Sequence, residues 1–487
     1  MAACHSSDDS ALEDTDTSQC TGSSDDDIKG KEQFRFDRKV MDEFNSSLEG
    51  KLINSSCFLF SLFYMWPYQT MVQTQNFLVE EFPERANTAG FVMMLSTTFP
   101  FVITHGLLSV TGLTNRCSYA VRMTVPPMLV VVLAMYLFCV LTTSEDQGLL
   151  LFSLYFTALV ISTAEGICEP AVYEIAGLMP STVPSMMVQS GNGACGLCVS
   201  CIQVLTRLFC AGLGPVSKEQ LKALTKGFLV LMGLSNAAFL RLYWGSVRQT
   251  SPYKLFVMSH RAEDDDHSAE ESDGASLAKN AETEQMSLVM ATVLAIREIW
   301  PTFLSVVLTF FVTLTLWPVI PGRTCVGEEE RDETLQSWWF DIIIFTFNLS
   351  DFLGKSEPKS LKWGARVLTP MQHLLLAVLR GLIFAPLILT GSAPQKYDSH
   401  TARWVVLLSV FTLGITNGWL STVCFMRAPK AFPPSTPSLV ARQASSGLVL
   451  GLFTGISGGC MGAFLLSQTT LISDSLGGCY GATATPV

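Results

Sequence analysis

The sequence predicts an all-α integral membrane protein with eleven transmembrane helices, arranged as a half of six and a half of five. Its 487 residues are 49% apolar and only 15% charged, and the mean hydropathy is +0.36. The apolar residues come in blocks long enough to cross a hydrocarbon core of about 30 Å. One long polar segment, residues 246–298, separates six of these blocks from the other five.

The apolar blocks define the predicted spans and their orientation. Lys and Arg collect in alternate connections, and cytosolic loops are the ones that carry such an excess. This bias places the N-terminus in the cytosol and, because the number of spans is odd, the C-terminus outside. The connection with Lys218, Lys222 and Lys226 departs from the pattern. The spans are predicted at residues 52–73, 88–111, 120–142, 148–176, 184–210, 223–244, 299–320, 337–356, 366–391, 403–425 and 438–467.

The chain divides into five predicted regions. Its first residues are acidic and rich in Ser, a composition typical of disordered segments, and the long polar segment is acidic as well. Two helical halves joined by a flexible linker suit a transporter whose halves rock against each other. The alternative for the linker is a regulatory insertion unrelated to transport. The regions are a disordered cytosolic tail (1–50), a six-helix half (51–245), a cytosolic linker (246–298), a five-helix half (299–470) and a short extracellular tail (471–487).

Charge and motifs exclude several classes of partner. The net charge of −11 lies mainly outside the apolar blocks, in acidic runs such as Asp25-Asp26-Asp27, so a nucleic-acid partner is not expected. The Gly-x-x-x-x-Gly-Lys-Ser/Thr motif of ATP-binding loops does not occur, so no ATP-binding domain is expected. The 14 cysteines include no CxxC pair with a matching second half, and Cys195, Cys198, Cys201 and Cys210 lie inside apolar blocks, where Cys acts as a small hydrophobe, so neither a zinc site nor a disulfide framework is expected. We therefore expect no metal and no cofactor.

The eighth span carries the most informative polar residues. Asn348, Asp351 and Lys355 are spaced by three and four residues, so they share one face of a helix. Exposing a carboxylate to lipid costs roughly 3 kcal/mol. The polar face must therefore meet other helices or a water-filled cavity. It is either a structural Asp–Lys pair at a helix end or the lining of a substrate path.

The first span contains aromatic residues around a proline. Trp66, Tyr68 and Gln69 flank Pro67, which allows a kink because it has no N–H to donate. Aromatic rings beside a kink can stack on a planar ligand. The alternative is an aromatic belt at the membrane interface. We treat Trp66, Tyr68 and Gln69 as candidate substrate-binding residues.

The fourth span carries two carboxylates near its middle. Glu165 and Glu169 are four residues apart and therefore lie on the same face of the predicted helix. Two carboxylates on one face repel each other when both are ionised, so one proton can be shared between them. They are candidates for substrate binding and for coupling to protons. The alternative is a structural role in which each pairs with a residue of another helix.

Arg380 lies in the middle of the ninth span. A guanidinium buried in a membrane is expected to face a carboxylate of a neighbouring helix. Asp351 and Asp341 of the same half are the candidates. We therefore assign Arg380 as a structural charge within the membrane.

Several of these stretches together resemble the equilibrative nucleoside transporter family, over most of residues 52–467. They are Phe347-Asn-x-x-Asp-x-x-Gly-Lys355, Arg380-x-x-x-Phe384-x-Pro386, Gly414-x-Thr-Asn-Gly-Trp-Leu-Ser421, Ala176-Gly-Leu-Met-Pro180 and Pro67-Tyr-Gln69. The resemblance implies a fold related to the major facilitator architecture, with the N-terminus inside and the C-terminus outside. It also implies that the substrate is a nucleoside or a nucleobase.

The resemblance carries over to individual residues. Asp351 and Lys355 match the Asp and Arg that engage the ribose in that family, and Asn348 lies beside them. Tyr68 stands where the family usually has Trp, and Glu169 stands where it often has the Gln that reads the base. Lys cannot make the bidentate contacts of Arg, so these three departures leave the substrate preference open.

The function expected from the sequence is transport of nucleosides or nucleobases, with purines favoured, by alternating access across the plasma membrane. Transport is expected to be facilitative, and Glu165 and Glu169 make proton coupling a second hypothesis. A secondary transporter of another small polar solute, such as a sugar or an organic cation, is the alternative. A membrane-embedded enzyme is disfavoured because His105 and His373, the histidines within spans, have no recognisable catalytic partners in the sequence. The protein is expected to meet only its small-molecule substrate and the lipid bilayer.

Overall fold

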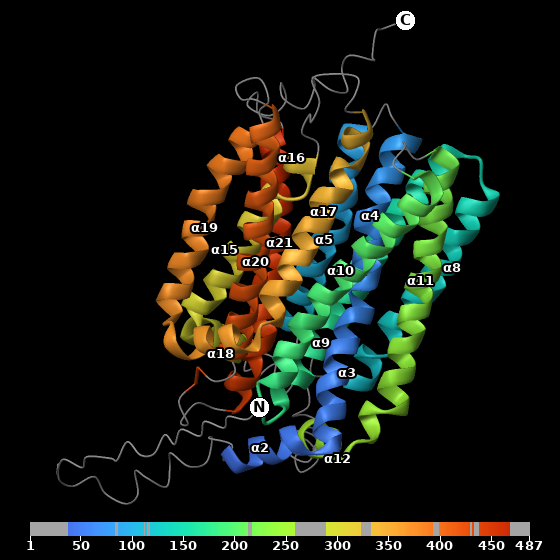
Figure 1. Ribbon diagram of the computed structural model, residues 1–487. Helices are drawn as coiled ribbons and strands as arrows, with labels where there is room; N and C mark the ends of the chain where they lie inside the picture. Colours follow the sequence, from blue (N-terminus) through green and yellow to red (C-terminus); the bar gives the residue numbers. More distant parts are fainter. Residues whose placement is uncertain are drawn as a thin grey trace, which may run out of the picture.

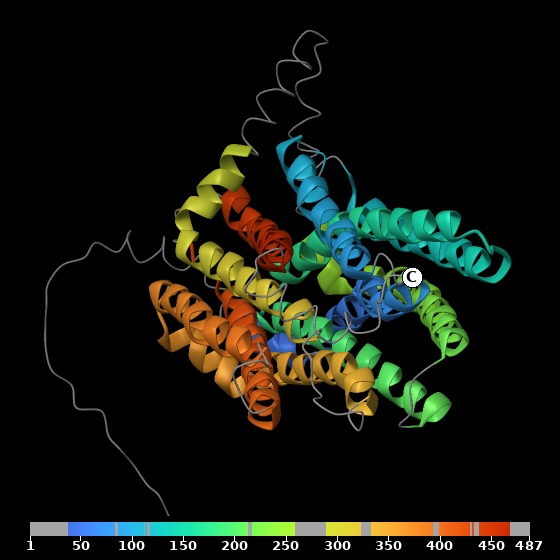
Figure 2. The ribbon, with the colours of Figure 1, turned by 90° about the horizontal axis from the view of Figure 1, so that it is seen from above.

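The computed structural model describes ten stretches of the chain, and the regular secondary structure in these stretches is helical. Long helices stand side by side in two groups, with a seam between the groups that runs through the molecule (Figures 1 and 2). The prediction of an all-α fold is therefore confirmed. The described residues are 38–82, 86–111, 113, 117–212, 217–258, 289–322, 333–392, 399–428, 431–432 and 438–467.

The first group, called here the N half, contains the helices up to residue 245. They are α2 (Arg38–Ser46), α3 (Leu48–Tyr64), α4 (Trp66–Glu81), α5 (Ala86–Val110), α7 (Tyr119–Arg122), α8 (Val125–Thr143), α9 (Gln147–Leu178), α10 (Val183–Ala211) and α11 (Lys218–Gly245). Three short turns of helix follow: η2 (Val247–Gln249), α12 (Ser251–Tyr253) and η3 (Lys254–Met258).

The second group, called here the C half, begins with a helical stretch at 289–298. Its other helices are α15 (Trp300–Leu316), α16 (Val319–Gly322), α17 (Glu333–Ser356), α18 (Pro358–Val367), α19 (Pro370–Gly391), α20 (Ser399–Arg427) and α21 (Ser438–Ser467). The bundle has two ends, which we call the α2 end and the α16 end. They lie at the bottom and the top of Figure 1.

Nine helices of the described residues are long and apolar enough to cross a membrane. They correspond to nine of the eleven predicted spans. The predicted span 52–73 is instead two helices, because α3 ends at Tyr64 and α4 begins at Trp66, with Pro67 in its first turn. The predicted span 337–356 lies in α17, whose apolar run is interrupted by Asp341, Asp351 and Lys355. The count of eleven spans and the orientation of the termini stay predictions.

The ends of the predicted regions differ from the structure. Helix α2 and the start of α3 lie within residues 38–50, the last part of the predicted disordered tail. Helix α2 is held to the bundle by Phe44, which is buried. The next helix, α3, is capped by Ser47, whose Oγ accepts a hydrogen bond of 2.9 Å from the Gly50 N–H. Residues 1–37, 259–288 and 468–487, to which much of the predicted tails and linker belong, lie outside the described residues.

The two halves meet closely along α10 and α17, which lie side by side at the seam in both ribbon views (Figures 1 and 2). Glycines of α10 make this contact: a Cβ atom on Gly193 would lie 3.0 Å from Phe352, and one on Gly196 would lie 2.9 Å from Asn348. Within the C half, a Cβ on Gly418 would lie 2.1 Å from the Asp351 carbonyl oxygen. Small residues let membrane helices approach to this distance.

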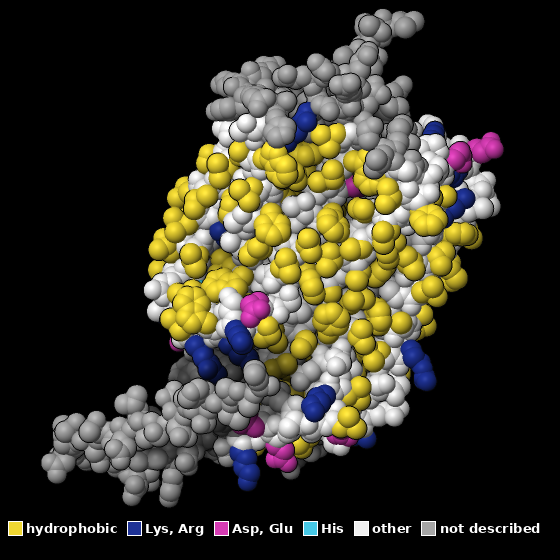
Figure 3. Space-filling view, in the orientation of Figure 1, with side chains coloured by type: hydrophobic (Ala, Val, Ile, Leu, Met, Phe, Trp, Pro, Cys, Tyr) yellow, Lys and Arg dark blue, Asp and Glu magenta, His cyan; other side chains and the backbone are white. Residues whose placement is uncertain are grey.

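The outer surface of the bundle is apolar. Hydrophobic side chains cover the middle of the face in Figure 3, whereas Lys, Arg, Asp and Glu gather mainly near the two ends. Large apolar side chains such as Phe152, Leu205, Leu382 and Leu408 are more than half exposed. A surface of this kind is suited to a lipid environment.

Candidate substrate site between the two halves

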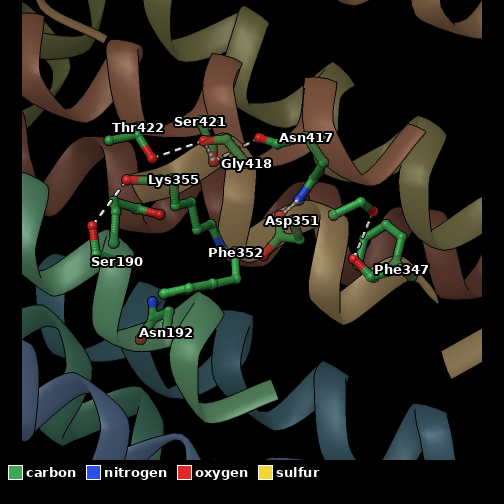
Figure 4. A network of polar contacts seen from close by, with 12 residues as sticks. Ser190, Asn192, Phe347, Asp351, Phe352, Lys355, Asn417, Gly418, Ser421 and Thr422 are labelled. Atoms are coloured by element: carbon green, nitrogen blue, oxygen red, sulfur yellow. Dashed lines mark hydrogen bonds and ion pairs between the residues drawn. The ribbon is translucent and has the colours of Figure 1, made fainter. Parts of the chain in front are cut away.

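The polar face of α17 is buried at the centre of the bundle. Lys355 Nζ lies 2.7 Å from Asp351 Oδ2, and both side chains are less than 10% exposed. Asn417 of α20 donates a hydrogen bond of 2.8 Å from Nδ2 to Asp351 Oδ1. Figure 4 shows these residues together, with Ser190 and Asn192 of α10 on the opposite side of the seam. Each carboxylate oxygen of Asp351 therefore has its own partner, which fixes the orientation of the group.

A chain of hydrogen bonds links this pair to Arg380 of α19. Thr313 Oγ1 of α15 donates to Asn417 Oδ1 at 2.9 Å and accepts from an Arg380 terminal nitrogen at 2.9 Å. Arg380 Nε donates to Thr416 Oγ1 at 2.9 Å, and its terminal nitrogens also reach the carbonyl oxygens of Thr309 and Leu413 at 3.1 Å. Four helices of the C half are joined in this way.

The expectation that a carboxylate accepts directly from Arg380 is wrong. Helix α19 packs against α15 and α20, and the hydroxyl and carbonyl groups of those helices receive the guanidinium donors. Among the described residues, the hydrogen bonds that link Arg380 to Asp351 run through Thr313 and Asn417. Asp341 forms an ion pair with Arg207 of the N half instead.

Replacing Arg380 with lysine is expected to lower uptake without abolishing insertion. A lysine keeps the charge, but it cannot reach α15 and α20 at once in the way that the planar guanidinium does. The loss of one hydrogen bond to a charged group corresponds to roughly 2 kcal/mol. Uptake and protein abundance in the membrane would be measured together. Uptake equal to that of the unchanged protein would show that the chain of hydrogen bonds does not position Asp351.

Asn348 faces the N half rather than Asp351. Its Nδ2 donates a hydrogen bond of 2.6 Å to Ser200 Oγ of α10. A Cβ atom on Gly196 would lie 2.9 Å from Asn348 Oδ1 and 3.4 Å from Gln69 Nε2, so both amide side chains approach this glycine. Gln69 of the N half and Asn348 of the C half therefore both lie beside Gly196 at the seam.

The two glutamates of α9 point toward the break between α3 and α4. Glu169 Oε1 accepts a hydrogen bond of 3.1 Å from the Tyr64 hydroxyl, and Glu165 Oε1 accepts one of 3.1 Å from the Tyr68 backbone N–H. That N–H belongs to the first turn of α4, where helical N–H groups have no partner within the helix. Glu165 Oε2 has no hydrogen-bond partner among the described residues. Both side chains are buried on one face of α9, as the spacing predicts.

A further set of polar residues beside Glu169 was missed by the sequence reasoning. Tyr173 lies one turn along α9, and its hydroxyl accepts hydrogen bonds from Gln189 Nε2 at 2.6 Å and Asn192 Nδ2 at 3.2 Å. Its ring stacks on Phe425 of α20, with centroids 4.6 Å apart. The spacing of four residues from Glu169 is the signal that could have found it.

The aromatic candidates of the first span have different positions. Trp66 is buried in a cluster within the N half that includes Met71 and Leu78, so the structure does not place it with the other site residues. The Tyr68 ring lies 6.1 Å from the Phe101 ring of α5 and packs against the large central cluster. Its backbone N–H donates the hydrogen bond to Glu165.

The polar groups of the two halves face each other across the seam. Lys355 is close enough to Glu169 to interact with it electrostatically, and Ser190 Oγ donates a hydrogen bond of 2.9 Å to the Lys355 carbonyl oxygen. Six of the predicted residues thus lie along or beside the seam: Gln69, Glu165, Glu169, Asn348, Asp351 and Lys355. Among the described residues, no cluster of His, Cys, Asp and Glu has the arrangement of a metal site. The site offers donors and acceptors to a polar solute.

The two-half helical fold has an architecture like that of the major facilitators. The solved structure of the proton:xylose symporter XylE with bound 6-bromo-6-deoxy-D-glucose matches with a TM-score of 0.57 over 90% of this chain and 94% of that chain, at 14% identity. A bacterial homologue of the iron transporter ferroportin, in its outward-facing state, matches with a TM-score of 0.52 at 14% identity, over 87% of this chain and 95% of that chain.

The chain belongs to the equilibrative nucleoside transporter family, as its motifs indicated. The profile described as "Nucleoside transporter" matches residues 155–467. Equilibrative nucleoside transporter 1 of Mus musculus is 24% identical over 75% of this chain and 80% of its own length. Equilibrative nucleotide transporter 8 of Arabidopsis thaliana is 31% identical over 32% of this chain, and equilibrative nucleoside transporter 4 of Homo sapiens is 27% identical over 40% of it. These last two matches span only 37% and 34% of the relatives' lengths. The protein is a multi-pass membrane protein.

Proposed function

We propose that the protein carries nucleosides or nucleobases across the plasma membrane by alternating access. The observation that supports this best is the buried Asp351–Lys355 pair, which lies at the seam and is held by Asn417 from a neighbouring helix. An ion pair that serves only the C half would not need a position next to the N half. Family membership and the fold related to the major facilitators agree with this function.

The site chemistry suits a ribose. A carboxylate accepts two hydrogen bonds from neighbouring hydroxyl groups, and an ammonium donates to the same hydroxyls. Asp351 and Lys355 would meet the sugar, and Asn348 and Gln69 beside Gly196 would meet polar edges of the solute. Lys355 stands where the family has Arg and offers a single point of charge. We therefore expect contact with the ribose to be weaker here than with Arg, and free nucleobases to be accepted.

The glutamates of α9 would read the base. A protonated carboxyl group can donate to a purine ring nitrogen, whereas an ionised one can accept only from N–H groups. Glu169 has the Tyr64 hydroxyl on one oxygen, and Glu165 has a free Oε2 within the described structure. These two residues support a preference for purines and make coupling to protons a testable extension.

A carrier of another small polar solute, such as a sugar or an organic cation, is the second candidate. Glu165 and Glu169 have no ion-pair partner within the N half among the described residues, a feature that would also suit a cationic substrate. Uptake of labelled purine and pyrimidine nucleosides, free bases, glucose and a quaternary ammonium compound would separate the candidates. Uptake of glucose or of the cation alone would overturn the proposal. Surface labelling of intact cells would test the plasma membrane assignment.

Replacing Glu169 with glutamine is expected to flatten the dependence of uptake on external pH. Because the protonated carboxyl is more abundant at lower pH, uptake by the unchanged protein should rise as the external pH falls. Glutamine is uncharged at every pH and keeps a donor and an acceptor at this position. Uptake would be measured at external pH values from about 5.5 to 8, the range around physiological pH.

The matched control for this experiment is Glu145→Gln, which removes an exposed carboxylate just before the first residue of the same helix and away from the site. An unchanged pH profile in the Glu169→Gln protein would contradict the assignment. Accumulation of a substrate that cells do not metabolise, under an inward proton gradient, tests coupling itself. An internal level that never exceeds the external level would show a purely equilibrative carrier.

A further inference from the structure

A ladder of contacts joins α10 to α17 along the seam. The two helices run antiparallel, since Ser190 meets Lys355, Gly193 meets Phe352, and Gly196 meets Asn348. The last rung toward the α16 end is Arg207 of α10, which forms an ion pair with Asp341 of α17. This pair therefore lies beyond the candidate substrate site, on the side of the bundle that the predicted topology places outside the cell.

The Arg207–Asp341 pair, called here the outer latch, is well enclosed. Arg207 is 7% exposed and the Asp341 side chain is fully buried. The Arg207 guanidinium also lies over the Trp338 ring, 4.5 Å from its centroid. The neighbouring Trp339 is held within the C half, since its Nε1 donates a hydrogen bond of 2.7 Å to the Pro321 carbonyl oxygen of α16. The segment of α17 that carries Asp341 is thus fixed to its own half.

The opposite end of the molecule is hollowed. A cavity of about 610 Å³ opens at the α2 end, and its walls come from both halves. Thr182 and Val183 of the N half line it together with Trp300, Arg366 and other residues of the C half. In this structure the latch joins the halves at the α16 end, and the cavity lies between residues of both halves at the α2 end, where Met186 still packs against Leu361 and Val423.

The other buried ion pairs described here do not cross the seam. Arg122 and Glu174 both belong to the N half, and Asp351 and Lys355 belong to one helix of the C half. Movement of one half against the other leaves such pairs intact. It must separate Arg207 from Asp341 if α10 and α17 part at the α16 end.

We propose that the outer latch holds the external pathway closed and must break each time the carrier opens outward. The inference rests on the proposed alternating-access function. Once the halves part, the charges of Arg207 and Asp341 are both hydrated, and their hydration compensates for the lost ion pair. If one charge is removed, the closed state loses its ion pair and retains the other charge in a buried position. The equilibrium should then shift toward the outward-open state.

The test uses a cysteine placed under the latch. Gln203 is buried and lies one turn before Arg207 on the same face of α10. In the Gln203→Cys full-length protein, the rate of reaction with a membrane-impermeant thiol reagent added from outside reports opening of the external path. The same proteins with Gln203 retained give the background from native cysteines such as Cys210, which is exposed.

In the Gln203→Cys protein, Asp341→Asn is expected to raise the labelling rate by roughly tenfold, because the outward-open state is then no longer a minor population. Asp341→Glu keeps the charge and is expected to label slowly. The charge reversal Arg207→Asp with Asp341→Arg is expected to restore slow labelling. Lys218→Gln is the control, since Lys218 pairs with Glu81 within the N half at 3.1 Å and should leave the rate unchanged.

Equal labelling rates in the Asp341→Asn and Asp341→Glu proteins would overturn the latch. Labelling is measured without substrate, so its outcome is independent of what the protein carries. If Asp341→Asn labels fast and no nucleoside or nucleobase is taken up by the unchanged protein, the latch stands and the proposed substrate class fails. If nucleosides are taken up and the labelling rate does not respond to the charge at position 341, only the latch fails.

Discussion

Replacing Asp351 with alanine is expected to abolish uptake. The change removes the acceptor of Asn417 and the partner of Lys355 in a single step. It also leaves the Lys355 ammonium buried without its carboxylate, and breaking a buried pair in this way costs roughly 3 kcal/mol or more. A fall in protein abundance is therefore expected together with the loss of uptake.

A double variant separates these two effects. Asp351→Ala combined with Lys355→Met removes both charges, and replacing a buried pair by apolar residues is often neutral for stability. This protein should regain its abundance in the membrane and still fail to transport. Uptake per molecule would be measured after quantifying protein at the cell surface. Transport by the double variant at the normal rate would show that the pair is structural and lies outside the substrate path.

Replacing Arg122 with leucine is expected to give the largest loss of stability. Arg122 makes two hydrogen bonds to Glu174, of 2.8 and 3.1 Å, and both side chains are less than 10% exposed. Removing the guanidinium leaves a carboxylate that is buried and unpaired, which costs roughly 3–5 kcal/mol. Thermal unfolding of the purified protein in detergent would measure the change.

The control for Arg122→Leu is the variant that also carries Glu174→Leu. Because it has no buried charge at this position, it should unfold at nearly the temperature of the unchanged protein. Uptake should recover together with stability, since neither residue is placed in the substrate site. A double variant as unstable as the single one would show that the pair contributes specific contacts that leucines cannot replace.

Local spacing along single helices was readable from the sequence. The apolar blocks located the helices, and Pro67 marked the position where the first span breaks into α3 and α4. The spacing of four residues put Asp351 beside Lys355, and it put Glu165 and Glu169 on one face of α9. These predictions succeeded because the period of a helix is a local property of the chain. The motifs likewise indicated the family to which the chain belongs.

Contacts between helices could be known only from the tertiary structure. The bond from Asn417 to Asp351 joins residues 66 positions apart, and the latch joins positions 207 and 341 across the seam. Arg380 illustrates the reason: a charge in the middle of a span shows that some partner exists, but the packing of α19 on α15 and α20 decides which groups come within reach. Trp66 is a second example, since the sequence made it a candidate substrate-binding residue and the packing places it in the core of the N half. The sequence determines which residues share a helix face, whereas close packing at small residues such as Gly193, Gly196 and Gly418 determines which faces meet.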